Sequence, residues 1–231
     1  MIDSAATRAG TRPDLGAPAA ATTSSRHTVV LLAAGVVAGP LYVAVSLAQA
    51  LTRPGFDLSR HSWSVLANGD LGWIQMANLI LTGTLVIAFS IGQHRTLVTG
   101  RASTWAPRLI GAYGASLIGA GVFRADPVPG FPAGTPAGTA ISWHGMVHLM
   151  VGAVGFVCLT VACLLLARRF AATERGWAVW TAAAGVTFLG AFVGIASGAG
   201  TPATIQTFVL AVIIIWTWFS TYAVHLIRAG R

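Results

Sequence analysis

Six long apolar runs dominate the sequence and limit what the chain can fold into. They cover roughly residues 28–50, 73–93, 108–123, 143–167, 177–198 and 205–227. A helix of about 20 apolar residues is long enough to cross the hydrocarbon core of a bilayer. With 55% hydrophobic and only 9% charged residues, the chain lacks the polar side chains that a water-facing surface needs. We therefore predict an all-α polytopic membrane protein whose residues 28–227 form a bundle of six transmembrane helices.

The arginines indicate how this bundle is oriented. All 14 basic residues are Arg. Six spans place eleven of them on one side, and these are Arg8, Arg12, Arg26, Arg95, Arg101, Arg108, Arg168, Arg169, Arg175, Arg228 and Arg231. Only Arg53, Arg60 and Arg124 fall on the other side. Because cytoplasmic loops carry the excess of basic residues, we predict that both termini are cytoplasmic.

The net charge of +8 therefore reflects membrane topology, and we expect no nucleic-acid partner. Residues 1–27 consist mainly of Ala, Thr, Ser, Gly and Pro without apolar periodicity, and we predict a disordered cytoplasmic tail. The abundance of Ala, Gly and Arg, together with the absence of Lys, is typical of a GC-rich bacterial genome. We expect a multi-pass protein of the bacterial inner membrane.

Small residues recur at intervals of four on two spans. Gly190, Gly194 and Gly198 follow this spacing on the fifth span, and Gly111, Ala115 and Gly119 follow it on the third. In membranes, stripes of small residues let neighbouring helices approach closely. The spacing predicts that both stripes are helix-packing surfaces.

Polar residues gather in three stretches that this topology places on the outer side. They are RHSWSVLANGDLGW (residues 60–73), FRADPVPGFPAGTP (residues 123–136) and SWHGMVH (residues 142–148). We predict that these stretches meet at one mouth of the bundle and form an outer polar cluster. Its members are Asp57, Arg60, His61, Ser64, Asp70, Asn78, Arg124, Asp126, His144 and His148.

Two chemistries are open to this cluster. His144 and His148 are four residues apart and share a helix face, so with Asp126 they could hold one divalent metal such as zinc. No Glu follows His144, so the general base of the HExxH motif is missing. The alternative is that the histidines form hydrogen bonds between helices. Likewise, Arg60 and Arg124 could bind a lipid phosphate or pair with the nearby aspartates.

Two motifs and one histidine resemble a known family. The first motif is S-x-L-x-x-G-x-x-G-W at residues 64–73, the second is G-x-F-x-x-D-P at residues 121–127, and the histidine is His144. In these features the chain resembles the bacterial membrane family called domain of unknown function 998, over roughly residues 30–225. The resemblance implies an integral membrane protein of six helices. It implies no activity, because the family has none established.

The polar cluster without a complete catalytic set favours a non-enzymatic function. We expect a protein without a cofactor that binds or organises a membrane lipid, a membrane protein partner or a second copy of itself through its outward-facing polar site. The first alternative is a metal-dependent membrane enzyme acting on a lipid or isoprenoid. The second is a small transporter, although no charged residue lies near the centre of a span.

Overall fold

The computed structural model describes residues 19–138, 140–198 and 200–230, and the side chains from residue 26 onward. These residues form long helices joined by loops, without a β-strand among them, so the all-α prediction is confirmed. The helices are α1 (Ala19–Thr52), α2 (Gly72–Thr96), α3 (Arg101–Val122), α4 (Trp143–Phe170), α5 (Arg175–Ala196) and α6 (Pro202–Ala229). A short 3₁₀ helix, η1 (Trp63–Ala67), lies between α1 and α2.

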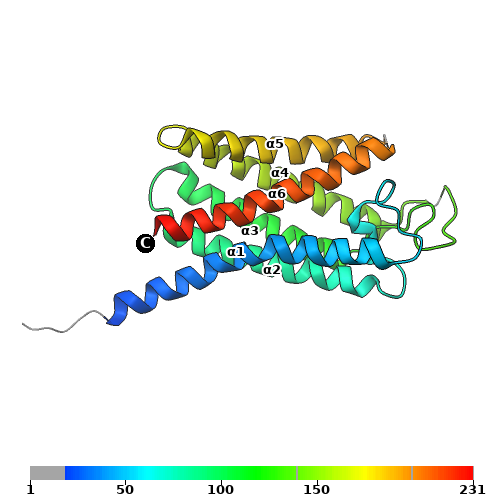
Figure 1. Ribbon diagram of the computed structural model, residues 1–231, viewed down its shortest axis with the longest axis horizontal. Coiled ribbons are helices and arrows are strands. Elements are labelled where there is room, and N and C mark those ends of the chain that lie inside the picture. Colours follow the sequence, from blue (N-terminus) through cyan, green and yellow to red (C-terminus); the bar gives the residue numbers. More distant parts are fainter. Residues whose placement is uncertain (1–18, 139, 199, 231) are drawn as a thin grey trace, which may run out of the picture.

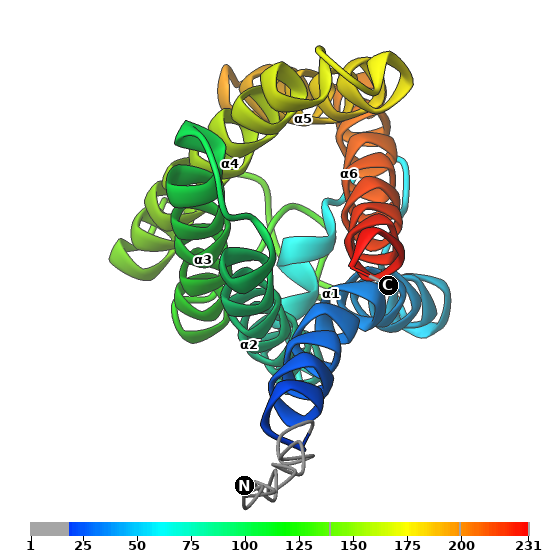
Figure 2. The ribbon, with the colours of Figure 1, turned by 90° about the vertical axis from the view of Figure 1, so that its left-hand side faces the viewer.

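The six helices form a ring in chain order. Each helix packs against the next one along the chain, and α6 closes the ring against α1 (Figure 2). The helices alternate in direction, so the start of α1 and the end of α6 lie at the same end of the bundle (Figure 1). We call this the arginine end. The opposite end, which carries the long connections from α1 to α2 and from α3 to α4, is the loop end.

Each predicted span corresponds to one helix, with differences at the boundaries. Helix α1 begins at Ala19, so residues 19–27 of the expected disordered tail are helical, and residues 1–18 of that tail lie outside the described part of the chain. Helix α3 begins at Arg101, before the predicted residue 108. The hydropathy pattern could not locate this start, because the first turns of α3 contain Arg and Thr and bury only small side chains such as Ala102 and Ala106.

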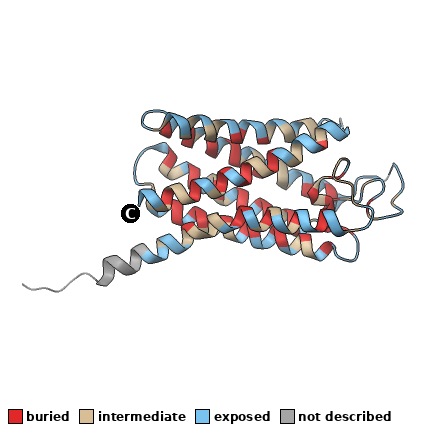
Figure 3. Cartoon of the chain, viewed as in Figure 1, coloured by how far each residue is buried: buried red, intermediate tan, exposed pale blue. Residues whose placement is uncertain are grey.

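The length and the outer surface of the helices suit an apolar environment. Five of them, all except α3, are long and apolar enough to cross a membrane. Large apolar side chains on the outer face are exposed, and Val30, Val179 and Leu210 are each at least 60% accessible. The buried residues face the inside of the ring (Figure 3). Because an aqueous protein rarely exposes so much apolar surface, this is a multi-pass membrane protein.

Close helix packing involves glycines of α2 and α3. In the predicted stripe of the third span, a Cβ atom on Gly111 would lie 3.2 Å from Ser90 Oγ of α2 and one on Gly119 would lie 3.6 Å from Val151 of α4, so this stripe contacts both neighbouring helices. A Cβ atom on Gly83 of α2 would lie 2.5 Å from the carbonyl oxygen of Gly114 on α3, so both positions require glycine. On α5, by contrast, a Cβ on Gly190 or Gly194 would meet no atom within 4 Å. The prediction for the fifth span was therefore wrong within this chain. A four-residue spacing identifies a smooth helix face but not whether a neighbour covers it.

Candidate functional site

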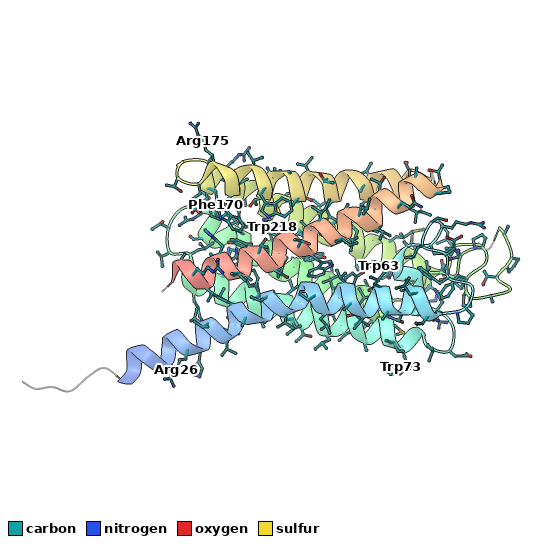
Figure 4. The ribbon with its side chains drawn as sticks, viewed as in Figure 1. Arg26, Trp63, Trp73, Phe170, Arg175 and Trp218 are labelled. Atoms are coloured by element: carbon teal, nitrogen blue, oxygen red, sulfur yellow. The ribbon has the colours of Figure 1, made fainter. Side chains whose placement is uncertain are left out.

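The stretch at residues 60–73 folds into the loop end of the ring. Helix η1 lies inside the ring of helices, where Trp63 and Leu66 are buried (Figures 2 and 4). Trp73, at the start of α2, is 64% exposed and lies on the outer side of the bundle, where a membrane-interface tryptophan is expected. We call this segment, residues 60–73, the plug, because it closes one end of the bundle.

Arg53 holds the plug in place. Its guanidinium donates hydrogen bonds to the carbonyl oxygens of Leu66 and Asn68, and it lies 4.9 Å from the centre of the Phe131 ring. The Asn68 side chain in turn donates to the carbonyl oxygen of Ala125 at 3.0 Å. Because Phe131 and Ala125 belong to the α3–α4 connection, these contacts fasten the two long loops together.

His61 makes a second connection between the two loops. Its Nδ1 accepts a hydrogen bond from the backbone N–H of Asp57 at 3.0 Å, so its Nε2 carries the proton and donates to the carbonyl oxygen of Pro129 at 3.1 Å. The ring is buried between Phe56 and Phe131. Both ring nitrogens are used by the fold, and neither is available to a ligand.

Asp126 caps the start of α4. Its carboxylate accepts hydrogen bonds from the backbone N–H and the hydroxyl of Ser142, the N-cap residue. It lies against Gly145, where a Cβ atom would come within 2.0 Å of Asp126 Oδ2. A negative charge at a helix N-terminus is favourable, so Asp126 has a structural role.

The two predicted histidines of α4 face different surroundings. His148 is buried, and its Nδ1 lies 3.1 Å and 2.8 Å from the carbonyl oxygens of Ala120 and Phe123 at the end of α3. Nδ1 must therefore carry the proton, which leaves Nε2 as a hydrogen-bond acceptor. His144 is exposed and stacks on Trp143 with 3.6 Å between ring centroids. Among the described residues, no three His, Cys, Asp or Glu side chains are placed to hold a metal ion, so the predicted ligands His144, His148 and Asp126 are not brought together.

The remaining members of the predicted cluster are spread over the loop end. Arg60, Asp70 and Arg124 are exposed, and none forms an ion pair within the described part of the chain. The Asp57 carboxylate accepts hydrogen bonds from the hydroxyl and the backbone N–H of Ser59, which lower its pKa. Nearby arginine and histidine charges lower the pKa of Asp57 further. Ser64 lies close to Ser62, with 3.1 Å between the two hydroxyl oxygens.

Asn78 belongs to a buried polar network between α1 and α2. It donates to the carbonyl oxygen of Tyr42 and the hydroxyl of Ser46, both at 3.2 Å. Gln75 joins the same network through Ser46 and Gln49. These bonds satisfy amides that would be costly to leave unpaired in a membrane, so Asn78 connects helices and does not line a ligand site.

A central cavity of about 120 Å³, partly open to the outside, lies between the helices next to the plug. All six helices and η1 contribute to its wall, which is mainly aromatic and aliphatic. The aromatic lining residues are Tyr42, Trp63, Tyr113, His148, Phe156, Phe188, Phe192, Phe208 and Trp216. No Asp, Glu or Arg is among the described residues that line it. A mainly apolar wall with a few polar groups is typical of sites for apolar ligands.

Three polar groups of the cavity wall lack partners among the described residues. The Nε2 atom of His148 and the hydroxyl of Tyr113 form no side-chain hydrogen bond. The indole N–H of Trp63 is buried without an acceptor. Ser62, Ser64 and His148 also line a second hollow at the surface of the loop end, so the two spaces adjoin.

Sequence reasoning placed His148 and Ser64 in the site but missed Arg53, Trp63 and Tyr113. From the sequence, Arg53 was recognised only as one of three arginines on the outer side. Tyr113 belongs to an apolar span whose inward face cannot be identified from a lone tyrosine. Trp63 could have been identified as a buried site residue from the sequence, because it is a large aromatic residue within a polar loop.

Comparison with known proteins agrees with the resemblance seen in the motifs. The model of the family described as Protein of unknown function (DUF998) matches residues 36–225. No curated protein and no solved structure was found to match the chain. The matched segment runs from the first apolar helix into the last one and includes the plug and the cavity. The chain therefore belongs to this family of proteins of unknown function.

Proposed function

We propose that the protein binds an uncharged, lipid-like amphiphile in its central cavity. The observation that carries this proposal is the Nε2 acceptor of His148, a buried residue of a mainly apolar and charge-free wall, which has no hydrogen-bond partner among the described residues. Buried polar atoms in proteins normally have partners, so an accessible one in a cavity favours a ligand with a hydrogen-bond donor. Tyr113 and the adjoining serines offer further donors and acceptors to the same headgroup.

The shape of the wall supports a ligand with an apolar tail. Phe156, Phe188 and Phe208, from three different helices, pack against one another in the cavity wall. The polar atoms lie toward the loop end, at His148 and η1. A bound amphiphile would therefore place its headgroup at the plug and its tail among the phenylalanines.

The absence of charge among the described lining residues supports an uncharged headgroup. Moving a carboxylate or phosphate out of water without a partner of opposite charge is strongly unfavourable. Arg60 and Arg124, which we considered as phosphate ligands, are exposed and do not line the cavity. A lipid phosphate held by them would lie outside the cavity. We therefore favour a hydroxyl or ester headgroup over an ionised one.

We propose that all six helices cross the bacterial inner membrane and that the arginine end is cytoplasmic. Helix α3 packs between α2 and α4 and runs through the same thickness of the bundle, although it is less apolar than they are (Figure 1). The described arginines at that end outnumber those at the loop end, as the positive-inside rule requires. The cavity headgroup site would then face outward.

A pair of glycine variants tests the cavity proposal. Gly152 lines the cavity and Gly190 does not, and at both positions a Cβ atom would meet nothing within 4 Å. Gly152→Leu should fill the cavity, whereas Gly190→Leu is a matched control on an open helix face. Native mass spectrometry of the full-length protein would measure binding of monooleoylglycerol. We expect binding by the wild type and by Gly190→Leu, and at least tenfold weaker binding by Gly152→Leu; equal binding by all three would overturn the proposal.

A second variant examines the headgroup contact. In His148→Asn the amide N–H can still donate to the α3 carbonyl oxygens, but the Nε2 acceptor is gone. We expect thermal stability close to that of the wild type and monooleoylglycerol binding weaker by about fivefold. Oleate at pH 8 has the same chain with a charged headgroup, and we expect it to bind much more weakly than monooleoylglycerol. Tighter binding of oleate would contradict the uncharged headgroup.

A further inference from the structure

A groove between the start of α3 and the end of α4 opens on the outer face of the bundle at the arginine end. It has a volume of about 680 Å³ and is lined by Arg101 and Trp105 of α3 and by Val161, Leu165, Arg168 and Arg169 of α4. It lies at the opposite end of α4 from His148 and shares no lining residue with the central cavity. Neither the plug nor the proposed function uses it.

The groove holds positive charge that nothing in the described structure neutralises. Arg101 and Arg168 are exposed and form neither a side-chain hydrogen bond nor an ion pair with described residues. Arg169 donates a hydrogen bond to the carbonyl oxygen of Thr99, which fixes its guanidinium beside them. The one described carboxylate at this end is that of Glu174, which lies 3.6 Å from His225 Nε2 and does not line the groove.

The rest of the groove is apolar and runs along the membrane-facing helices. Leu109, Val161 and Leu165 form this part, and Val161 is 39% exposed. Trp105 is half exposed at the charged end, and the guanidinium of Arg108 lies 5.5 Å from the centre of its ring. Tryptophan at such a position is typical of the membrane interface, where lipid headgroups meet acyl chains.

We propose that this groove binds an anionic phospholipid. Its phosphate would lie among Arg101, Arg168 and Arg169, because guanidinium groups match phosphate oxygens in charge and hydrogen-bond geometry. One acyl chain would lie along Val161 and Leu165. The positive charge of the groove favours an anionic ligand. The apolar strip formed by Leu109, Val161 and Leu165 favours a lipid over a free anion. This second site is independent of the central cavity and takes the opposite class of headgroup.

The test compares lipids that differ in the headgroup alone. Full-length protein in neutral detergent would be titrated with dioleoyl phosphatidylglycerol or dioleoyl phosphatidylcholine, and adducts would be counted by native mass spectrometry. We expect the wild type to bind phosphatidylglycerol more tightly. In the double variant Arg101→Gln, Arg168→Gln this affinity should fall on the order of 20-fold, since each arginine near a lipid surface contributes about fivefold. Equal affinity for both lipids in the wild type would overturn the proposal.

The matched control removes the same charge at the other end. In Arg60→Gln, Arg124→Gln two exposed arginines are lost from the loop end, and we expect the affinity for phosphatidylglycerol to stay within twofold of the wild type. An equal loss in both double variants would overturn the site in favour of general attraction to a cationic protein. No loss in Arg101→Gln, Arg168→Gln would overturn it as well.

A further variant and ligand separate a lipid from a free anion. Val161→Trp keeps every arginine but fills the apolar strip, and we expect it to weaken phosphatidylglycerol binding at least fivefold. Inorganic phosphate should bind to neither protein at millimolar concentration. Phosphate binding that Val161→Trp leaves intact, with unchanged phosphatidylglycerol binding, would show an anion site and contradict the lipid site.

Discussion

The two ends of the bundle use arginine and histidine in opposite ways. At the loop end, Arg53 donates to backbone carbonyl oxygens, and His61 accepts a hydrogen bond from Asp57 in its own loop and donates one to Pro129 in the other. At the arginine end, Arg101 and Arg168 are exposed without a partner among the described residues. Arg53 is therefore part of the fold, whereas Arg101 and Arg168 are available to the membrane.

The difference follows from the lengths of the connections. At the arginine end, residues 97–100 and 171–174 join consecutive helices directly, and few backbone groups need partners from elsewhere. Two connections at the loop end, from α1 to α2 and from α3 to α4, are long and partly buried, so their carbonyl and N–H groups need donors and acceptors from side chains. Polar residues at the loop end are thus mostly structural, and residues that remain unpaired there, above all His148 Nε2, are the better ligand candidates.

The largest effect is expected from Arg53→Ala. This change removes two charge-assisted hydrogen bonds that hold the plug, and it leaves the carbonyl groups of Leu66 and Asn68 without those donors. We expect the free energy of unfolding to fall by about 4 kcal/mol. Unfolding in sodium dodecyl sulfate, followed by circular dichroism, would measure it. Arg168→Ala at the other end should change the free energy by less than about 0.5 kcal/mol, and equal effects would contradict the contrast between the ends.

A pair of histidines gives a second comparison. His61→Ala removes two hydrogen bonds and the ring contacts with Phe56 and Phe131, so we expect a loss of about 2.5 kcal/mol. His225 lies at the arginine end, where its Nε2 is 3.6 Å from the partly exposed carboxylate of Glu174 and its ring contacts Phe170 and Trp177. His225→Ala should cost about 1 kcal/mol or less. The same unfolding measurement compares the two, and a larger loss from His225→Ala would reverse the assignment of structural histidines to the loop end.

The cap on α4 predicts a coupling between two residues. Gly145→Ala would place a methyl group against the Asp126 carboxylate and displace it from Ser142, which we expect to cost about 1.5 kcal/mol. In an Asp126→Ala background there is nothing to displace, so Gly145→Ala should be neutral or slightly stabilising there. A double-mutant cycle on unfolding free energies measures this coupling. Additive effects would show that Asp126 does not act through its contact with the start of α4.

The sequence alone was sufficient to predict the helices, but it was not sufficient to predict the site. The reason is physical. A membrane requires runs of apolar residues, so each helix could be recognised from its own segment. A site depends on which faces meet. His144 and His148 share a helix face by spacing, yet one stacks on Trp143 at the surface and the other contacts the end of α3. The cavity draws on all the helices at once, and no local pattern encodes such a convergence.

The smallest effect concerns Asp57 and depends on pH. Hydrogen bonds from Ser59 to the carboxylate lower the pKa of Asp57, so the ionised form is favoured in the folded protein. A lowered pKa means that this contribution is complete above the ordinary pKa of an aspartate and is lost as the pH falls through the folded value.

Asp57→Asn keeps an acceptor oxygen but removes the charge. It should therefore lower the thermal midpoint slightly at pH 7, and the difference from the wild type should shrink as the pH falls below the ordinary pKa of an aspartate, about 3.9, and vanish once Asp57 is protonated. Ser59→Ala provides the control, because without the Ser59 hydroxyl the effect of Asp57→Asn at pH 7 should shrink. A difference that persists at pH 2 would mean that Asp57 acts through shape and not through charge. The Asp57 side chain would then stabilise the loop end through its shape and hydrogen bonds alone, as the ring of His61 does.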